Sequence, residues 1–320
     1  MAHENSIPQN VAGLSLKGGR RDQFFFSLLE YYPEDKRWFL KSLLQVKDSE
    51  EAGGDEAIRE WIEDYELSEI VLDVPLTLPT CSLCHIDCPG ERHCPHPEVV
   101  EVRRKIDSVL EEDARMNLEN PKNYEFARNE DDTFDFLRDI THRPSTTHII
   151  SRSFKRRLKK GYLPYWNREV DFWVWCYYYD QLLELFNTSF DSYGNSSLMV
   201  QHRFSYLRRH FPDKLALFEC NTQIILVELL RSGVIRKSDI QRMNDLVEGP
   251  EAKLDIIKKV EEKLNVFIYD HDLELLVKNP RAFESFLLAL AGKNIIMGKN
   301  KDLPEWTKPN EVSFISPTFD

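Results

Sequence analysis

The stretch VAGLSLKGGRRDQFFFSLLEYYPEDKRWFLKSLLQV (11–46) decides the fold, because it holds three apolar runs separated by turns. VAGLSL has the length of a buried strand, KGGRRD indicates a tight turn, and QFFFSLLEYY predicts a second strand. RWFLKSLLQV predicts a third strand, although its periodicity also allows a helix. We expect the strands near 11–17, 23–31 and 37–46 to be antiparallel neighbours in one sheet.

A helix and another strand follow this pattern. DEAIREWIEDY (55–65) carries apolar residues at helical spacing, and EIVLDVPLTLP is a short, branched run ended by prolines. The second run predicts a buried parallel strand near 69–74. Strand, helix and strand in this order are a βαβ signal, so the first strand and the one at 69–74 should be parallel neighbours.

The rest of the chain is mostly helical by pattern. EVVEVRRKIDSVLEEDARMNL (98–118) and the aromatic run at 170–186 predict helices, the second of them buried. KLALFEC (214–220) predicts a strand that leads into the helix IILVELLRSG, AFESFLLALAGK predicts a late helix, and EVSFISP predicts a final strand. We expect an α/β protein with a mixed sheet flanked by helices, and a mostly helical insertion over 98–210.

Composition limits the compartment and the partners. No stretch approaches the roughly 20 apolar residues that a membrane helix needs. The first ten residues, MAHENSIPQN, lack the basic and apolar regions of a secretory signal. We therefore expect a cytoplasmic protein without a membrane partner. The net charge of −12 repels nucleic acid at long range, so such binding needs a local basic patch. SRSFKRRLKK (151–160), which includes Arg156 and Arg157, is a candidate, with a solvated face as the simpler interpretation.

The loop at 80–97 concentrates cysteine and histidine. Its candidate ligands are Cys81, Cys84, Cys88 and Cys94, with His85, His93 and His96 among them. A C-x2-C hook lets two thiolates converge on one cation, zinc takes four such ligands, and a loop rich in Pro and Cys gains order from a metal. We expect a structural zinc ion here. Unbound thiols and a redox C-x-x-C are the alternatives, and the spacing leaves open which four side chains bind.

Acidic residues interrupt three apolar segments. Asp73 lies in VLDVP, Glu219 in LALFEC, and Glu284 on AFESFLLAL. A buried carboxylate is costly unless it is paired or binds a cation. Separated acids that converge in the fold would suit Mg²⁺, whereas a cap or a pair with arginine is the alternative for each.

These motifs resemble an uncharacterised family of predicted nucleases with an RNase H-like fold (domain of unknown function 429). VLDVPLTLP is similar to the family's IDAPLGLP segment, LFECNTQIILVELL to its IEVYPAATL strand and helix, and FESFLLALAGK to its DALLCALTA helix. VAGLSLKG resembles its Gly-containing first strand. Arg143 precedes a Ser/Thr-rich stretch, as an arginine does in the family's central motif. The resemblance covers both ends of the chain and leaves the middle unmatched.

The resemblance implies a single RNase H-like domain over 10–320, with the zinc loop (80–97) and the helical segment (98–210) inserted. The chain departs from the family at Ser15, where the family's first strand carries an Asp. In RNase H-like nucleases that Asp bridges both metals, and a serine hydroxyl neither offsets cation charge nor offers two oxygens. Glu284 also stands in place of an Asp.

Two functions follow as hypotheses. In the first, the chain is a divergent RNase H-like nuclease or phosphoryl hydrolase, in which Asp73, Glu219 and Glu284 hold Mg²⁺ or Mn²⁺. Substrate phosphates would then contact basic side chains, namely Arg143, Arg156 and Arg157. In the alternative, the chain is a non-catalytic RNase H-like binding or scaffold module that lost the strand-one Asp, and the zinc loop presents a surface to a protein partner.

Overall fold

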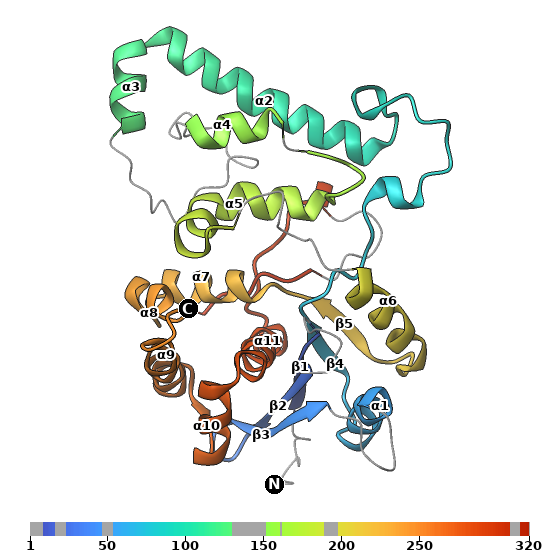
Figure 1. The fold of residues 1–320 in the computed structure, drawn as a ribbon, viewed down its shortest axis with the longest axis vertical. Helices are drawn as coiled ribbons and strands as arrows, with labels where there is room; N and C mark the ends of the chain where they lie inside the picture. The colour runs from blue at the N-terminus through green and yellow to red at the C-terminus, as the bar shows by residue number, and fades with distance from the viewer. Residues whose placement is uncertain are drawn as a thin grey trace, which may run out of the picture. The chain divides into compact units, whose positions relative to one another are not determined.

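The computed structural model describes residues 9–16, 24–46, 54–129, 152–160, 162–188, 198–307 and 314–319. The chain divides into two compact units (Figure 1). Unit 1 comprises Met1–Leu76, Ser196–Lys301 and Ser313–Asp320, and unit 2 comprises Thr77–Asn195 and Asp302–Val312. The segment at 98–210, expected as one insertion, is thus shared between both units. The turn predicted at 17–22 and the residue Arg143 lie outside the described residues.

Unit 1 contains a six-stranded mixed sheet of order β5-β4-β1-β2-β3-β6. Its strands are β1 (Gln9–Ser15), β2 (Phe24–Tyr32), β3 (Arg37–Val46), β4 (Glu69–Leu72), β5 (Ala216–Glu219) and β6 (Val266–Phe267). The strands β1, β2 and β3 are antiparallel neighbours, and β4 is parallel to both β1 and β5. The predicted pairing of the first four strands is therefore confirmed, and RWFLKSLLQV is a strand rather than a helix.

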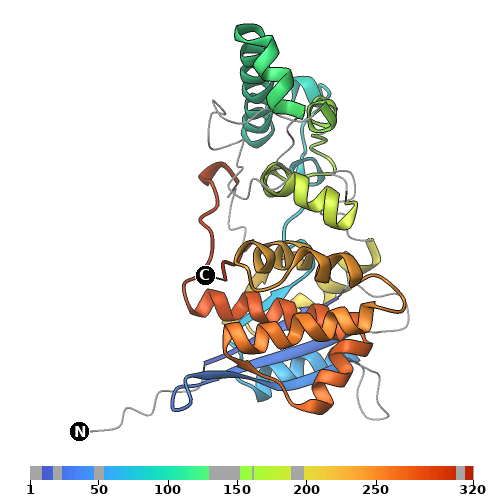
Figure 2. The ribbon, with the colours of Figure 1, turned by 90° about the vertical axis from the view of Figure 1, so that its left-hand side faces the viewer.

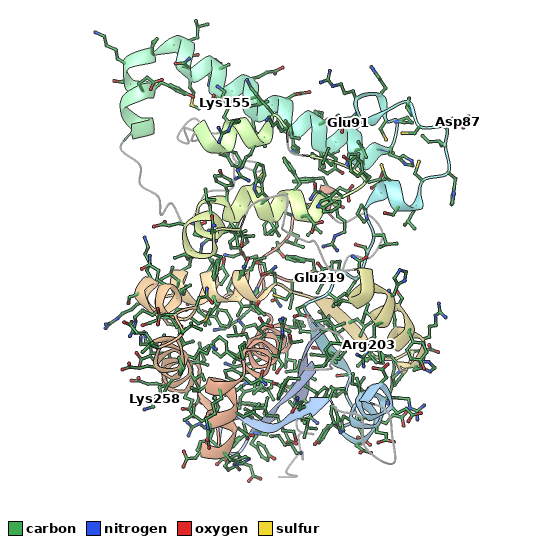
Figure 3. All side chains as sticks on the ribbon, viewed as in Figure 1. Asp87, Glu91, Lys155, Arg203, Glu219 and Lys258 are labelled. Atoms are coloured by element: carbon green, nitrogen blue, oxygen red, sulfur yellow. The ribbon has the colours of Figure 1, made fainter. Side chains whose placement is uncertain are left out.

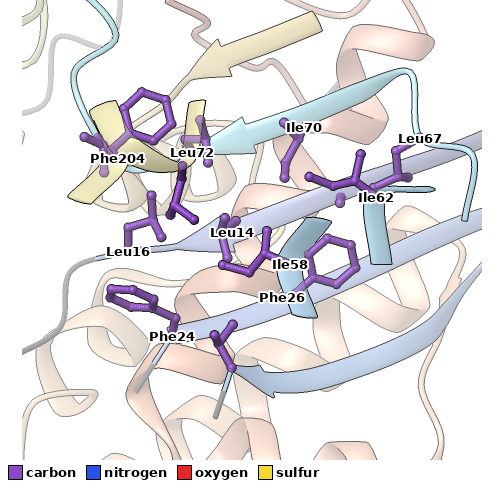
Figure 4. Close-up of a cluster of buried hydrophobic side chains, with 14 of the residues drawn as sticks. Leu14, Leu16, Phe24, Phe26, Ile58, Ile62, Leu67, Ile70, Leu72 and Phe204 are labelled. Atoms are coloured by element: carbon purple, nitrogen blue, oxygen red, sulfur yellow. The ribbon is translucent and has the colours of Figure 1, made fainter. Parts of the chain in front are cut away.

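The helices of unit 1 cover both faces of the sheet (Figure 2). They are α1 (Gly54–Asp64), α6 (Leu198–Leu207), α7 (Thr222–Arg231), α8 (Lys237–Arg242), α9 (Gly249–Leu264), α10 (Asp270–Lys278) and α11 (Pro280–Ile296). Side chains alternate between the two faces along each strand. Leu14, Phe26 and Leu72 pack with Ile58 of α1 and Phe204 of α6 in one core (Figure 4). The other face of β1 packs against α11.

The end of the chain differs from the prediction. EVSFISP was expected to form a strand, but its described part makes two isolated bridges, Glu219 with Phe314 and Asn300 with Pro317. Proline has no N–H group and cannot donate to a continuing ladder. The short strand β6, which pairs in parallel with β3, was not predicted, because two residues are too few to show a period.

Unit 2 is built around helices with an aromatic core. Its helices are α2 (Pro97–Glu119), α3 (Pro121–Asn129), α4 (Arg152–Leu158) and α5 (Glu169–Phe186), and its short turns are η1 (Thr80–Leu83), η2 (Glu91–His93) and η5 (Glu305–Thr307). Phe154 of α4 packs against Trp175 and Tyr179 of α5, with ring centroids 4.8 and 4.6 Å apart. The aromatic run at 170–186 is therefore core, as predicted. In the described part of the chain, no helix is long and apolar enough to cross a membrane.

Candidate functional site

Three of the residues singled out by the sequence meet at one end of β1. Ser15 Oγ lies 3.0 Å from Asp73 Oδ2 and 3.1 Å from Glu284 Oε2. The N–H group of Leu16 donates to Asp73 Oδ1 at 2.8 Å. Since both carboxyl oxygens are within hydrogen-bond distance of one hydroxyl, they are at most about 6 Å apart. Two oxygens bound to one Mg²⁺ ion lie within about 4 Å of each other, so a shared cation requires the two carboxylates to be at the near end of this range or to move together.

Strand pairing brings Ser15 and Asp73 together. Leu14 of β1 is paired with Leu72 of the parallel strand β4, so the next residue of each strand reaches the same end and the same face of the sheet. Ser15 is fully buried and Asp73 is almost so. Their position therefore follows from a local register that the apolar residues of both strands fix.

A close approach of α11 supplies Glu284. A Cβ atom on Gly13 would lie 2.2 Å from the carbonyl oxygen of Ser285, so only glycine lets the helix backbone sit this near to β1. Ser27 of β2 and Ser285 are joined by a hydroxyl pair at 2.5 Å. Glu284 precedes Ser285 on the helix, and its half-buried carboxylate reaches the hydroxyl of Ser15.

Basic groups lie beside Glu284. Arg281, in the first turn of α11, pairs with Glu284 Oε2 at 2.5 Å. Burial lowers the pKa of Lys253 on α9, and the negative charge of Glu284 opposes that shift. Neither residue was predicted as part of the site, although the i,i+3 spacing of Arg281 and Glu284 in the sequence is typical of an ion pair on a helix.

Glu219 lies on the neighbouring strand and has other partners. It ends β5, opposite Leu72, and is marked in Figure 3. Its Oε2 accepts a hydrogen bond from the N–H of Leu76 at 3.0 Å, and its backbone pairs with Phe314. The structure thus joins Asp73 and Glu284 through Ser15 and places Glu219 at the adjacent strand end. Among the described residues, no three His, Cys, Asp or Glu side chains form a ready-made metal-binding group.

The cysteine loop belongs to unit 2. The six cysteines are free thiols, and His96 Nε2 lies 3.1 Å from Cys84 Sγ. Burial raises the pKa of the Cys81 thiol, and the nearby thiols of Cys94, Cys84 and Cys88 raise it further, whereas Arg103 lowers it. The four cysteines predicted as ligands therefore gather in one region of the loop.

The basic run at 151–160 is partly structural. Phe154 and Leu158 of α4 are buried in the core of unit 2, and Lys155 pairs with the buried Asp113 of α2. Arg156 is exposed and Arg157 is half-buried. Lys159 and Lys160 are exposed as well, so these lysines are also available to a phosphate, and Arg143 lies outside the described residues.

Sequence reasoning missed a polar cluster at the start of α5. Arg168 forms hydrogen bonds with Asp171 and with Thr77, and the buried Glu169 accepts from Thr80 and Tyr162 at 3.0 and 3.2 Å. Burial raises the pKa of Glu169. An acid at the start of a helix followed by an aromatic run is the sequence signal, but it also fits an ordinary helix beginning.

Comparisons of the chain with protein-family models, with curated proteins and with solved structures gave no match.

Proposed function

We propose that unit 1 is a divergent RNase H-like module that binds Mg²⁺ or Mn²⁺ through Asp73 and Glu284, with Glu219 as a further ligand, and hydrolyses a phosphodiester. The observation that carries this proposal is the meeting of two carboxylates at Ser15. Such oxygen donors suit hard divalent cations. A bound cation would polarise the phosphoryl group and lower the pKa of an attacking water.

The sheet order supports the RNase H-like assignment. An antiparallel β1-β2-β3 meander, with β4 and then β5 added in parallel on the far side of β1, is the strand order expected for that fold. Asp73 and Glu219 lie at the carboxyl ends of neighbouring parallel strands, where open α/β sheets bind ligands. The resemblance of the motifs around these acids to the predicted-nuclease family adds to this support.

The residues present fit a cation, and they also explain how the site is stable without one. Asp73 is held by the N–H of Leu16 and by Ser15, and Glu284 is held by Arg281. Ser15 lowers the negative charge of the site relative to an aspartate there, so we expect weaker metal binding than a three-carboxylate set would give. The guanidinium of Arg281 is suited to contact a phosphate oxygen beside the same carboxylates.

The test is a titration of the full chain with Mn²⁺ by calorimetry, combined with cleavage assays on single-stranded and duplex RNA and DNA with and without Mg²⁺. We expect Asp73→Asn to abolish both metal binding and cleavage, because it removes a formal charge at nearly constant shape. Glu274→Gln, on the exposed surface of α10, is the matched control and should change neither.

Ser15→Asp tests the geometry separately. We expect it to strengthen Mn²⁺ binding, since it adds a third carboxylate between Asp73 and Glu284. An unchanged affinity would mean that these carboxylates do not share a cation. The proposal fails if the wild-type chain neither binds Mn²⁺ nor cleaves any substrate in the presence of metal.

A second candidate function is a non-catalytic binding module. The pairing of Glu284 with Arg281 and the neutral Ser15 favour it, because they satisfy the carboxylates internally. In that case Asp73→Asn should leave partner binding intact and should raise stability by relieving carboxylate repulsion. Metal binding and cleavage, which Asp73→Asn abolishes only if the chain is a nuclease, therefore separate the two functions.

A further inference from the structure

Exposure separates the seven candidate zinc ligands of unit 2 into two groups. Cys94 is buried, and Cys81, Cys84 and His96 are half-buried. The remaining candidates, His85, Cys88 and His93, are exposed. Structural zinc sites exclude solvent from a closed tetrahedron, so the less exposed group matches the ligand set that such a site needs.

Local geometry brings two members of this group, Cys84 and His96, into contact. The η1 turn closes with the N–H of Cys84 on the carbonyl of Cys81, as in a C-x2-C hook. His96 Nε2 lies 3.1 Å from Cys84 Sγ. With Zn–S near 2.3 Å and Zn–N near 2.0 Å, a sulfur and a nitrogen ligand of one tetrahedral zinc ion are about 3.5 Å apart, so the two side chains are close to the required separation. Cys94, two residues before His96, packs in the core of unit 2.

We propose that Cys81, Cys84, Cys94 and His96 bind one structural zinc ion, and that Cys88, His85 and His93 do not. Three thiolates and one neutral imidazole complete a tetrahedron and leave no open position, so the ion orders the loop and performs no chemistry. This proposal is independent of the function proposed for unit 1, because none of its ligands belongs to that unit.

The surroundings suit the charge of this ligand set. Zn²⁺ with three thiolates carries a net negative charge, and the buried Nη2 of Arg103 has no hydrogen-bond partner among the described residues. Arg103 lies in the second turn of α2, the helix that begins directly after His96. His96 is the N-cap of α2, whose beginning carries a partial positive charge. Arg103 is therefore assigned as a positioning residue that donates to a zinc-bound sulfur.

The ion would connect separate segments of unit 2. The N–H of Cys81 donates to the carbonyl of Pro164 at 3.1 Å, and the adjacent Thr80 donates to Glu169 of α5. Cys94 and His96 immediately precede α2. A zinc ion bound to these residues would thus hold the segment before α5 and the beginning of α2 together. The loop buries little apolar surface of its own, so it gains order from such an ion.

The experiment measures the zinc content of the reduced full-length chain by mass spectrometry and its retention against a competing chelator. We expect about one zinc per chain in the wild type, and loss of zinc in Cys84→Ser and His96→Gln. Cys88→Ser and His85→Gln are matched controls and should keep the metal. The cobalt-substituted protein should show a tetrahedral spectrum with thiolate charge transfer, which Cys88→Ser leaves unchanged and Cys84→Ser weakens.

Two results would overturn the assignment. A wild-type chain without zinc excludes the site, and loss of zinc in Cys88→Ser with retention in His96→Gln makes Cys88 the fourth ligand. If Cys84→Ser does not fold, the comparison of His96→Gln with His85→Gln tests the ligand assignment, which requires zinc to be lost from the first variant and kept in the second. Arg103→Gln should weaken zinc retention about tenfold, whereas Arg104→Gln, at an exposed position, should not; equal retention in both removes the role given to Arg103.

Discussion

At the scale of single residues, the hydroxyl of Ser15 lies within hydrogen-bond distance of two carboxylates, those of Asp73 and Glu284, but has one proton to donate. It can donate to Asp73 or to Glu284 at a given moment, so the backbone N–H of Leu16 and the guanidinium of Arg281 must provide the remaining stabilisation. Ser15 is therefore a structural part of the site whether or not a cation binds there.

Replacing Ser15 tests this role. We expect Ser15→Ala to lower the free energy of unfolding by about 1–3 kcal/mol, because it leaves an oxygen of the buried Asp73 without its hydroxyl partner. Urea denaturation at neutral pH without metal measures the change. Ser205→Ala, on the exposed side of α6, should change stability by less than about 0.5 kcal/mol. Equal effects in the two variants would contradict the account.

Lys293 on α11 predicts a pH dependence. Burial lowers its pKa from 10.5 to about 8, while its Nζ donates to the carbonyl of Leu264. Between pH 10.5 and about 8, Lys293 is protonated in the unfolded chain and largely neutral in the folded chain, so the unfolded chain binds more protons. The free energy of unfolding therefore rises with pH across this range, and the contribution of Lys293 to it is lost as the pH falls through about 8.

The measurement compares Lys293→Met with the wild type by denaturant unfolding at neutral pH and near pH 10. The stability of the variant relative to the wild type should decrease as pH rises, since only the wild type gains from deprotonation of Lys293. Lys258→Met, at an exposed position on α9 (Figure 3), should show no such trend. A parallel pH profile for the wild type and Lys293→Met would rule out a lowered pKa of Lys293.

At the scale of elements, the contact between α11 and β1 depends on glycine. A Cβ atom at Gly13 would lie 2.2 Å from Ser285 O and 2.3 Å from Ala289 N, and one at Gly292 would lie 2.3 Å from Val11 Cγ2. The first two contacts are with helix backbone, which cannot move without shifting the whole of α11 and, with it, Glu284.

We therefore expect Gly13→Ala to destabilise the chain by about 3 kcal/mol or more, at the upper end of overpacking costs. Gly90→Ala, where a Cβ atom meets nothing within 4 Å but φ is 90°, should cost about 1 kcal/mol. Thermal unfolding monitored by circular dichroism compares the two. A Gly13→Ala chain as stable as Gly90→Ala would show that α11 can withdraw from β1 at little cost.

At the scale of the whole molecule, each unit contains a cluster of buried hydrophobic residues. One is formed by the sheet with α1 and α6, and the other by α2, α4 and α5 with the buried Cys94. If zinc orders the cysteine loop, its removal should act on unit 2 alone.

Hydrogen exchange of the full chain should show this division. After zinc removal by a chelator, we expect faster exchange in 80–119 and 162–186 and unchanged exchange in β1, β2 and α11, because the proposed ligands all belong to unit 2. Readdition of zinc should restore protection. Faster exchange in β1 on chelation would mean that the stability of unit 1 depends on the metal.

The sequence by itself determined the order and pairing of the first strands, since alternating and continuous apolar runs record which faces are buried. It also determined that cysteines cluster in one loop and that Asp73, Glu219 and Glu284 interrupt apolar segments. These are local properties, and each can be read within one element.

Only the tertiary structure decided which of these residues meet. Ser15 contacts Glu284 across 269 positions of sequence because Gly13 admits the helix backbone, a steric condition that no local pattern records. Burial likewise divides the candidate ligands of the loop, since Cys94 packs in the core of unit 2 whereas Cys88 is exposed. Which side chains contact one another depends on the surfaces that the folded chain brings together. This is a property of the packing of the whole unit and not of the spacing of residues along the sequence.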